Sequence, residues 1–190
     1  IHSEIEGAWS LLVPDAEASR VAVEHLVALG HQDIAFIGGL PHSPTANRRV
    51  EGFRSGVAAA GLPVGSDRIT RLGFRPDQGA AALDRLLELP TMPTAVVVTN
   101  VNAAIGVLRQ ARRRGVQVPE DLSVVTVDDA WTAENTWPPL TAVKMPLYEL
   151  GRSAVAALVD AVQGAPPRRL VVGSPPPLLI ERESTAPPRG

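Results

Sequence analysis

The stretch AVVVTNVNAAIGVLRQARRRGVQVPEDLSVVTVDD, residues 95–129, decides the fold class. It contains two short apolar runs, AVVV and SVVTV, separated by a segment that we expect to be a helix over residues 102–114, ended by Gly115. Strands that are apolar throughout and alternate with helices are typical of a parallel sheet covered on both faces. The stretch therefore predicts an α/β fold built on a doubly wound parallel sheet.

The same alternation of strand and helix patterns extends in both directions along the chain. Helices are predicted over about residues 16–29, 77–89 and 146–164, and another helical pattern runs through Val50, Phe53, Val57 and Ala60 and ends at Gly61. Strands are predicted over residues 34–39, 68–72, 140–143, 170–172 and 178–180. The last segment, TAPPRG at residues 185–190, is expected to fray.

Composition places the chain among ordinary globular proteins. Its 190 residues are 45% hydrophobic and carry a net charge of −2, so they form neither a disordered chain nor a basic nucleic-acid-binding surface. The absence of cysteine excludes disulfides, thiolate catalysis and cysteine metal sites, and it is compatible with a reducing cytoplasm.

The sequence also bears on membranes and export. No run of 18 apolar residues occurs, so no membrane-spanning segment is expected. The opening IHSEIEGAWSLLV lacks the basic region of a signal peptide, and it also lacks a starting methionine. We interpret the sequence as a piece of a longer chain.

Catalytic and cofactor motifs are absent. The sequence contains no G-x-S-x-G, no P-loop, no G-x-G-x-x-G and no H-E-x-x-H. His25 and His31 are six positions apart, which is not the spacing of a helical pair of metal ligands. Because no pairing of a nucleophile with a base is visible, we expect no catalytic residues, no metal site and no cofactor.

Polar side chains follow the predicted strands, where an open parallel sheet binds its ligand. Arg48 and Arg49 fall in the first turn of a helix, which disfavours cations. Spacing alone favours both pointing into water, and the alternative is that one of them serves a ligand. Asn100 and Asn102 can each cap the next helix, so one of the two amides would be left for a ligand.

Asp128 and Asp129 end the strand SVVTV. Successive side chains of an extended strand diverge, which argues against a catalytic dyad or a two-carboxylate metal site. We expect one acid to face the crevice and the other to meet a backbone NH or an arginine. With an amide, an arginine and an aromatic wall, such an acid would suit a polyhydroxylated or nucleoside-like ligand.

Phe74, Trp131 and Trp137 are the candidates for that aromatic wall. The alternative is that they fill gaps in the core, and for Trp137 the two interpretations are equally favoured. The run Arg112–Arg114 ends a predicted helix, where cations complement the helix dipole. We therefore interpret these arginines as solvated.

Six segments resemble the lactose-repressor (LacI) family of bacterial transcription regulators in order and spacing. They are VEHLVALGHQDIAFIGG, RRVEGFRSGVAAAG, PTAVVVTNVNAAIG, GVQVPEDLSVVTVDDA, PPLTAVKMPLYELG and LLIERESTAPP. The resemblance implies an effector-binding core that looks like a periplasmic sugar-binding protein. Residues 13–145 and 174–190 would form its C-terminal subdomain and residues 1–12 and 146–173 a remnant of the N-terminal one. The helix-turn-helix DNA-binding part would be absent.

The resemblance also implies roles for individual residues. Arg49 matches the family's effector-binding arginine, Asn100 the asparagine after the central strand, and Asp128 the acid that accepts ligand hydroxyls. Asp129 would then serve the local fold. The expected chemistry is binding rather than catalysis.

Further pocket positions follow from the same resemblance. Phe74 falls where the family often places an aromatic wall, and Val13 and Leu147 match two variable pocket positions. One departure is that the family usually reads Asn-Asp where this chain has Asn100-Val101. A polar contact or a structural acid is therefore missing.

The function expected from the resemblance is ligand sensing in a LacI-type repressor. A sugar or similar small polar effector would modulate operator binding through the missing DNA-binding part, in a cytoplasmic homodimer without a cofactor or a membrane contact. A periplasmic sugar-binding protein of a transporter would use the same fold and chemistry. An enzyme acting on sugars or nucleosides is the third hypothesis.

Overall fold

A six-stranded sheet forms the centre of the molecule in the computed structural model, which describes residues 7–63 and 65–189. Its strands are β2 (Ile34–Gly38), β3 (Ile69–Arg71), β4 (Ala95–Val98), β5 (Ser123–Val127), β6 (Thr141–Lys144) and β8 (Leu178–Ile180). Their order is β3-β2-β4-β5-β6-β8, and every neighbouring pair is parallel except β6 and β8. The predicted doubly wound α/β fold is confirmed.

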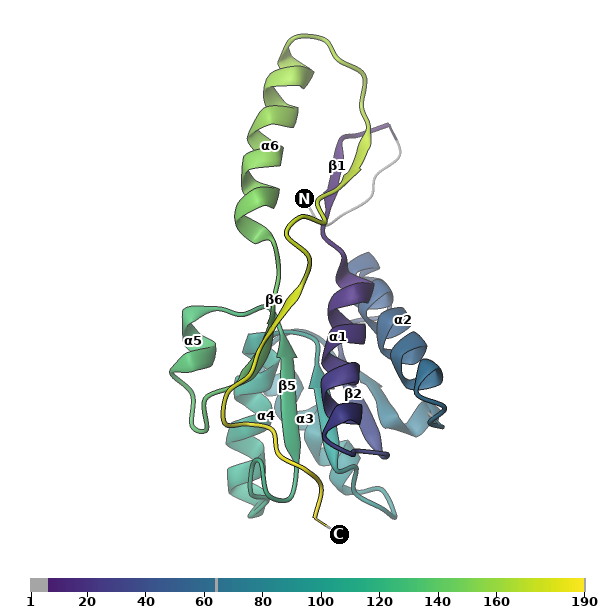
Figure 1. The fold of residues 1–190 in the computed structure, drawn as a ribbon, viewed down its shortest axis with the longest axis vertical. Helices are drawn as coiled ribbons and strands as arrows, with labels where there is room; N and C mark the ends of the chain where they lie inside the picture. The colour runs from purple at the N-terminus through teal and green to yellow at the C-terminus, as the bar shows by residue number, and fades with distance from the viewer. Residues whose placement is uncertain (1–6, 64, 190) are drawn as a thin grey trace.

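Helices cover both faces of this sheet (Figure 1). α1 (Asp15–Ala28) packs with α2 (Pro44–Ala59), and α3 (Pro76–Leu87) packs with α4 (Val101–Arg114). Alternate residues of β4 belong to two separate cores, with Val97 in the core of α1 and α2 and Val96 in that of α3 and α4. Because both sides of each central strand are buried, the strands are apolar throughout.

Glycines allow the helices of each pair to touch. A Cβ atom on Gly52 of α2 would lie 1.9 Å from the backbone oxygen of Ala16 in α1. One on Gly106 of α4 would lie 1.8 Å from the backbone oxygen of Pro76 in α3. Both helix pairs therefore pack backbone against backbone, which holds the turns at their N-terminal ends in place.

A second, smaller part lies beyond the carboxyl end of β6 (Figure 1). It contains α6 (Leu147–Val162) and a two-stranded parallel sheet of β1 (Ser10–Leu12) and β7 (Arg169–Val171). We call this part the arm, and the six-stranded sheet with α1–α4 the main unit. α6 buries only Leu150 and Ala157 and leaves several large apolar side chains exposed. Residues 1–6, which the sequence also assigns to the smaller subdomain, lie outside the described residues.

The C-terminal tail is held by the main unit, so the prediction that it frays is wrong for residues 185–189. The backbone oxygen of Ala186 lies 2.9 Å from Nε2 of His31 and accepts a hydrogen bond of 3.0 Å from Ser123 Oγ. Nε2 of His25 lies 3.0 Å from the hydroxyl of Thr185. No local pattern indicates these contacts, because the partners are more than 60 positions apart.

Three elements were not predicted: the strand β1, the short helix α5 (Trp131–Glu134) and a 3-10 turn over Ser66–Arg68. In the described part of the chain, no helix combines the length and the apolar character needed to cross a membrane.

Candidate binding site

A hollow of about 370 Å³ opens at the carboxyl edge of the main sheet, where β2, β4 and β5 end and α2 and α4 begin. Its lining consists of Ser43, Pro44, Thr45, Arg49, Phe74, Asn100 and Asp128. Four predicted site residues, Arg49, Phe74, Asn100 and Asp128, are thus brought together from segments far apart in the sequence. Their role in binding stays a prediction.

Arg49 is the buried cation of this site, with 3% of its surface exposed. Its Nη1 donates to the backbone oxygen of Thr99 and to Oδ2 of Asp128 at 3.1 Å, and its Nε donates to Oδ1 of Asp15 at 2.9 Å. Arg48 also binds Asp15, through Nη2 at 2.8 Å. The interpretation from spacing that both arginines point into water is therefore wrong. The buried carboxylate of Asp15 stabilises both cations at a helix N-terminus whose dipole disfavours them.

The charge of Arg49 is secured by its surroundings. Burial disfavours the cation, but the carboxylates of Asp128 and Asp15 and their hydrogen bonds more than offset this, so the pKa of Arg49 is raised above its usual value. The guanidinium of Arg49 is therefore a fixed, permanent positive charge beneath the site.

Asp128 is the only residue other than glycine with a positive φ, 71°, in the described part of the chain. A left-handed backbone costs such a residue about 1–2 kcal/mol. The amide of Asp128 donates to the backbone oxygen of Val143 at 3.0 Å, and the side chain keeps 26% of its surface exposed. The chain thus turns at the end of β5 in a way that presents this carboxylate to the hollow.

Asp129 points elsewhere and pairs with Arg182 at 2.8 Å. We predicted that one of the two adjacent acids faces the crevice and that the other meets a backbone NH or an arginine, and the structure shows the arginine. No local signal in the sequence identified Arg182 as the partner, because it lies more than 50 positions away, after the antiparallel strand β8.

Asn100 both caps α4 and lines the hollow. Its Oδ1 accepts from the amide of Ala103 at 3.0 Å, so the cap occupies the oxygen and not the NH₂ group of this side chain. Asn102 is exposed and does not line the hollow. The prediction that one asparagine caps the helix and the other is left for a ligand is therefore wrong, because Asn100 both caps the helix and lines the hollow. Ser43 caps α2 in the same way through Ala46, so two helix N-termini with partial positive charge border the hollow.

Phe74 forms the aromatic wall of the hollow. A Cβ atom on Gly39 would lie 2.2 Å from the tip of its ring, so only a glycine at this position lets the ring lie against the loop after β2. Val101, the departure from the family pattern, is buried in the core between α3, α4 and the sheet. It contributes packing where the family usually has an acid.

The other predicted pocket residues do not line this hollow. Val13 is buried in the core, and Leu147 is exposed at the start of α6. Trp131 and Trp137 are 75% and 84% exposed and border other hollows next to α4. Placing the two tryptophans at the Arg49 site was wrong, and so was the alternative that they fill core gaps, because the segment after Asp129 runs outward over α4.

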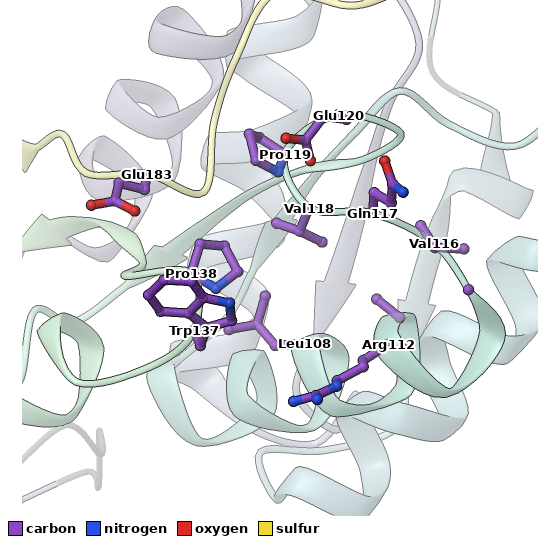
Figure 2. A pocket seen from close by; sticks show the side chains of 12 residues that line it. Leu108, Arg112, Val116, Gln117, Val118, Pro119, Glu120, Trp137, Pro138 and Glu183 are labelled. Atoms are coloured by element: carbon purple, nitrogen blue, oxygen red, sulfur yellow. The ribbon is translucent and has the colours of Figure 1, made fainter.

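A larger hollow, of about 610 Å³, lies beside the C-terminal end of α4 (Figure 2). Trp137 and Pro138 form one wall, Leu108 and Arg112 the floor, and Glu183 stands on the rim. It is larger than the hollow at Arg49, but it contains no buried charged group aimed into it. The smaller hollow is therefore the better candidate for specific binding of a polar ligand.

The chemistry available at the smaller hollow is that of binding. A carboxylate accepts hydroxyl hydrogens, an amide and two helix N-termini donate, and an aromatic ring covers an apolar face. Its lining contains no histidine or cysteine, and the hydroxyl of Ser43 serves as a helix cap. Among the described residues, no three His, Asp or Glu side chains gather in a way that could hold a metal ion.

Comparison with known proteins extends this picture. A family model described as a periplasmic binding protein-like domain matches residues 23–185. The repressor CytR of Escherichia coli strain K12 is 38% identical over 152 residues, which are 80% of this chain and 45% of CytR. The chain spans about half the length of the curated relatives it matches.

Solved structures are similar over the whole chain. A LacI family transcriptional regulator from Mycobacterium smegmatis is 41% identical with a TM-score of 0.96, covering 100% of this chain and 70% of that one. The regulator CelR, solved as a complex with cellobiose, is 31% identical with a TM-score of 0.88, covering 97% of this chain and 56% of that one.

Proposed function

The chain belongs to the LacI family of transcriptional regulators, and from this membership we propose that it is the effector-sensing core of a DNA-binding repressor. Its ligand is a sugar or a similar small polar metabolite, and ligand binding modulates operator binding through a DNA-binding part outside this chain. The protein acts in the cytoplasm, where operator DNA is found.

The observation that carries this proposal is the pairing of Arg49 with Asp128 at the carboxyl edge of the sheet. Asp128 adopts an unfavourable backbone conformation and keeps part of its carboxylate open, although a glycine would fit the turn without strain. A hydroxyl group that donates to this carboxylate makes a charge-assisted hydrogen bond, worth roughly 1.5–3 kcal/mol. The complex of CelR with cellobiose supports a sugar as the class of ligand.

Two other functions are less well supported. A transporter's binding protein would use the same fold, but the curated relatives named above and the similar solved structures are regulators. An enzyme would need a nucleophile or a base at the hollow. The only carboxylate of the lining, Asp128, is already paired with Arg49, the hydroxyl of Ser43 caps α2, and the hydroxyl of Thr45 accepts from Arg48. We therefore propose that the protein is not an enzyme and needs no cofactor.

Effector binding would act by changing how the main unit and the arm sit against each other. The chain passes between them near Val13, after β6 and before β8. The hollow lies at the carboxyl edge of the main sheet, and the arm lies beyond that end of the main unit (Figure 1). A ligand that binds one arrangement better than the other shifts the population toward it. In the proposed division, residues 13–145 and 174–190 form the effector-binding subdomain, and residues 1–12 and 146–173 belong to its partner.

Thermal unfolding of this chain, and of the full-length protein from its gene, against pentoses, hexoses, disaccharides, polyols and nucleosides tests the proposal. A ligand present at about 100 times its dissociation constant stabilises by roughly 2.7 kcal/mol, which raises the melting temperature by roughly 5–10 °C. Asp128→Asn should weaken binding roughly tenfold or more, because the charged acceptor is lost.

The matched control is Asp33→Asn, which breaks an ion pair with Arg68 at the opposite edge of the sheet. It should leave the ligand affinity unchanged. If Asp128→Asn and Asp33→Asn lower the ligand affinity equally, the proposed site is wrong. The same holds if no compound stabilises this chain or the full-length protein. Turnover of any sugar or nucleoside that disappears in Asp128→Asn would favour the enzyme instead.

We further propose that the regulator is a homodimer and that the exposed tryptophans lie at its interface. Trp131 and Trp137 line one hollow beside α4, and Trp137 also lines the larger one. Both rings are highly exposed, and large apolar side chains that are exposed together mark sites of protein–protein contact. Figure 2 shows the ring of Trp137 standing over Leu108 beside Arg112. The exposed apolar side of α6 is the other candidate, and we assign it to the rest of the smaller subdomain.

Sedimentation of the full-length protein distinguishes these two surfaces. Trp137→Glu should shift the protein from dimer to monomer, because a charge would be buried without a partner. Tyr148→Glu on α6, also highly exposed in this chain, is the matched control and should leave the dimer intact. The opposite pattern would exclude the tryptophan surface as the interface.

A further inference from the structure

Two loops border the hollow at Arg49. The loop after β2, residues 39–43, which we call the β2–α2 loop, leads into α2, and the segment Ser43–Thr45 contributes three of the seven lining residues. The turn after β3 carries Phe74, the aromatic wall. A shift of either loop would therefore change the shape of the hollow and the contacts that a ligand can make in it.

Arg71, the last residue of β3, ties the β2–α2 loop to this strand. Its Nε donates to the backbone oxygen of Gly39 at 3.2 Å, and its Nη2 donates to that of Leu40 at 3.1 Å. Nη2 also donates to Oδ1 of Asn47, in the first turn of α2, at 2.7 Å. Because a guanidinium is planar and has two donors along one edge, it can hold two successive carbonyl groups at once.

The partners of Arg71 differ in kind from those of other arginines. Arg49 and Arg68 pair with carboxylates, whereas the partners of Arg71 in the described part of the chain are neutral oxygens. Partial burial lowers the pKa of Arg71 below its usual value. Withdrawing a cation from water without an acidic partner costs free energy, and arrangements of this kind concentrate at functional sites.

The side chains of the β2–α2 loop contribute little to holding it. Pro41 and His42 are exposed, and Leu40 is half-buried. The loop is joined to β3 and the turn after it by the guanidinium of Arg71 and by the ring of Phe74, which lies against Gly39. Phe74 itself lines the hollow, and Arg71 does not. Arg71 therefore holds the loop without occupying the space of the ligand.

From these contacts we propose that Arg71 is a positioning residue of the effector site, which holds the β2–α2 loop in its binding position before the ligand enters. The proposal rests on the proposed function, because it concerns the same hollow. A ligand that fits one loop position binds with an affinity proportional to the fraction of molecules in that position. Without Arg71, part of the binding free energy would be used to order the loop.

Hydrogen exchange of the ligand-free chain tests this positioning without knowledge of the effector. The amide of Ser43 donates to the backbone oxygen of Leu40 at 3.0 Å, and Arg71 holds the same oxygen. In Arg71→Gln this amide should exchange at least roughly fivefold faster, because the turn opens more often. The matched control is Arg68→Gln, since Arg68 precedes β3 and donates through the same two atoms, Nε and Nη2, to Asp33. It should leave the exchange of the Ser43 amide unchanged.

The sugar and nucleoside panel tests the consequence for binding. With a sugar that stabilises this chain or the full-length protein, Arg71→Gln should lower the affinity roughly tenfold, through slower association rather than faster dissociation. A side chain that touched the ligand would instead change the dissociation rate. Arg71→Lys keeps the positive charge but not the two-donor edge, so it should lower the affinity as Arg71→Gln does. Arg68→Gln should bind the sugar as the unchanged chain does.

Asn47→Ala keeps the test decisive if Arg71→Gln does not fold. It removes one of the three contacts of Arg71, so it should speed the exchange of the Ser43 amide and lower the sugar affinity, each by roughly twofold. If Arg71→Gln does not fold, unchanged exchange and affinity in Asn47→Ala would overturn the proposal.

Three results with Arg71 would also overturn the proposal. One is unchanged exchange of the Ser43 amide, or unchanged sugar affinity, in Arg71→Gln. Another is an equal loss of affinity in Arg71→Gln and Arg68→Gln, which would indicate general destabilisation. The third is full affinity in Arg71→Lys, because charge alone would then suffice. If no sugar binds and Ser43 still exchanges faster in Arg71→Gln alone, the proposed function fails while the positioning of the loop stands.

Discussion

The main unit and the arm differ in how completely they bury their apolar surface. In the main unit, every residue of β2, β4 and β5 is buried, because helices cover both faces of the sheet. In the arm, α6 is as long as α2 but buries two residues, and its β-sheet has two strands. Two-sided burial stabilises the main unit, whereas α6 has most of its apolar surface uncovered by the described residues.

The largest effects are expected from truncating the core of the main unit. Phe53 is fully buried against Phe36, with ring centroids 5.1 Å apart. The substitution Phe53→Ala should lower the free energy of unfolding by roughly 3–5 kcal/mol. Leu158→Ala on the exposed side of α6 should change the free energy of unfolding of this chain by less than about 0.5 kcal/mol. Urea unfolding measures both.

The same pair of variants sharpens the comparison in the full-length protein. If other residues cover α6 there, Leu158→Ala should cost roughly 2 kcal/mol or more, as buried leucines do. A cost that stays near zero would show that α6 faces water in the regulator as well.

Glycines provide a second matched pair with effects of opposite sign. Gly52→Ala should destabilise by roughly 3 kcal/mol, because its Cβ would meet the backbone of Ala16 at 1.9 Å. Gly151→Ala in α6 meets no atom within 4 Å and should stabilise the helix by roughly 0.5–1 kcal/mol. Thermal unfolding with circular dichroism measures both, and equal destabilisation would contradict the close α1–α2 contact.

The smallest expected effect concerns pH. Burial lowers the pKa of His31 below its usual value of 6.5, although the bond to Ala186 opposes this and His25 adds to it. The unfolded chain therefore binds more protons than the folded chain just below 6.5, so stability should fall as pH falls through that window. His31→Gln should flatten this dependence in melting temperatures measured between about pH 8 and about pH 5.

No histidine occurs in residues 7–12 or 146–173, so the pH effect should be confined to the main unit. Hydrogen exchange across the same range should show faster exchange in α1 and at the start of β5, with α6 unchanged. Faster exchange in α6 alone would contradict the assignment to His31.

Regular strands and helices were largely predictable, because their signals lie within a few positions of each other. The runs AVVV and SVVTV indicated β4 and β5, and Gly115 indicated the end of α4, where the structure shows a φ of 74°. The short helix α5 was missed because four residues carry no periodic pattern. The bound tail was missed because its contacts come from distant segments.

The candidate site divides in the same way. The alternation of apolar runs and helical patterns was enough to predict the α/β fold. The family resemblance then singled out Arg49, Asn100, Phe74 and Asp128, which the structure places around one hollow. The contact of Asp15 with Arg49, and the position of Trp131 and Trp137 outside the hollow, became visible in the tertiary structure alone. The physical reason is that electrostatic pairing and burial depend on which segments meet in space, whereas strand and helix patterns depend on neighbours along the chain.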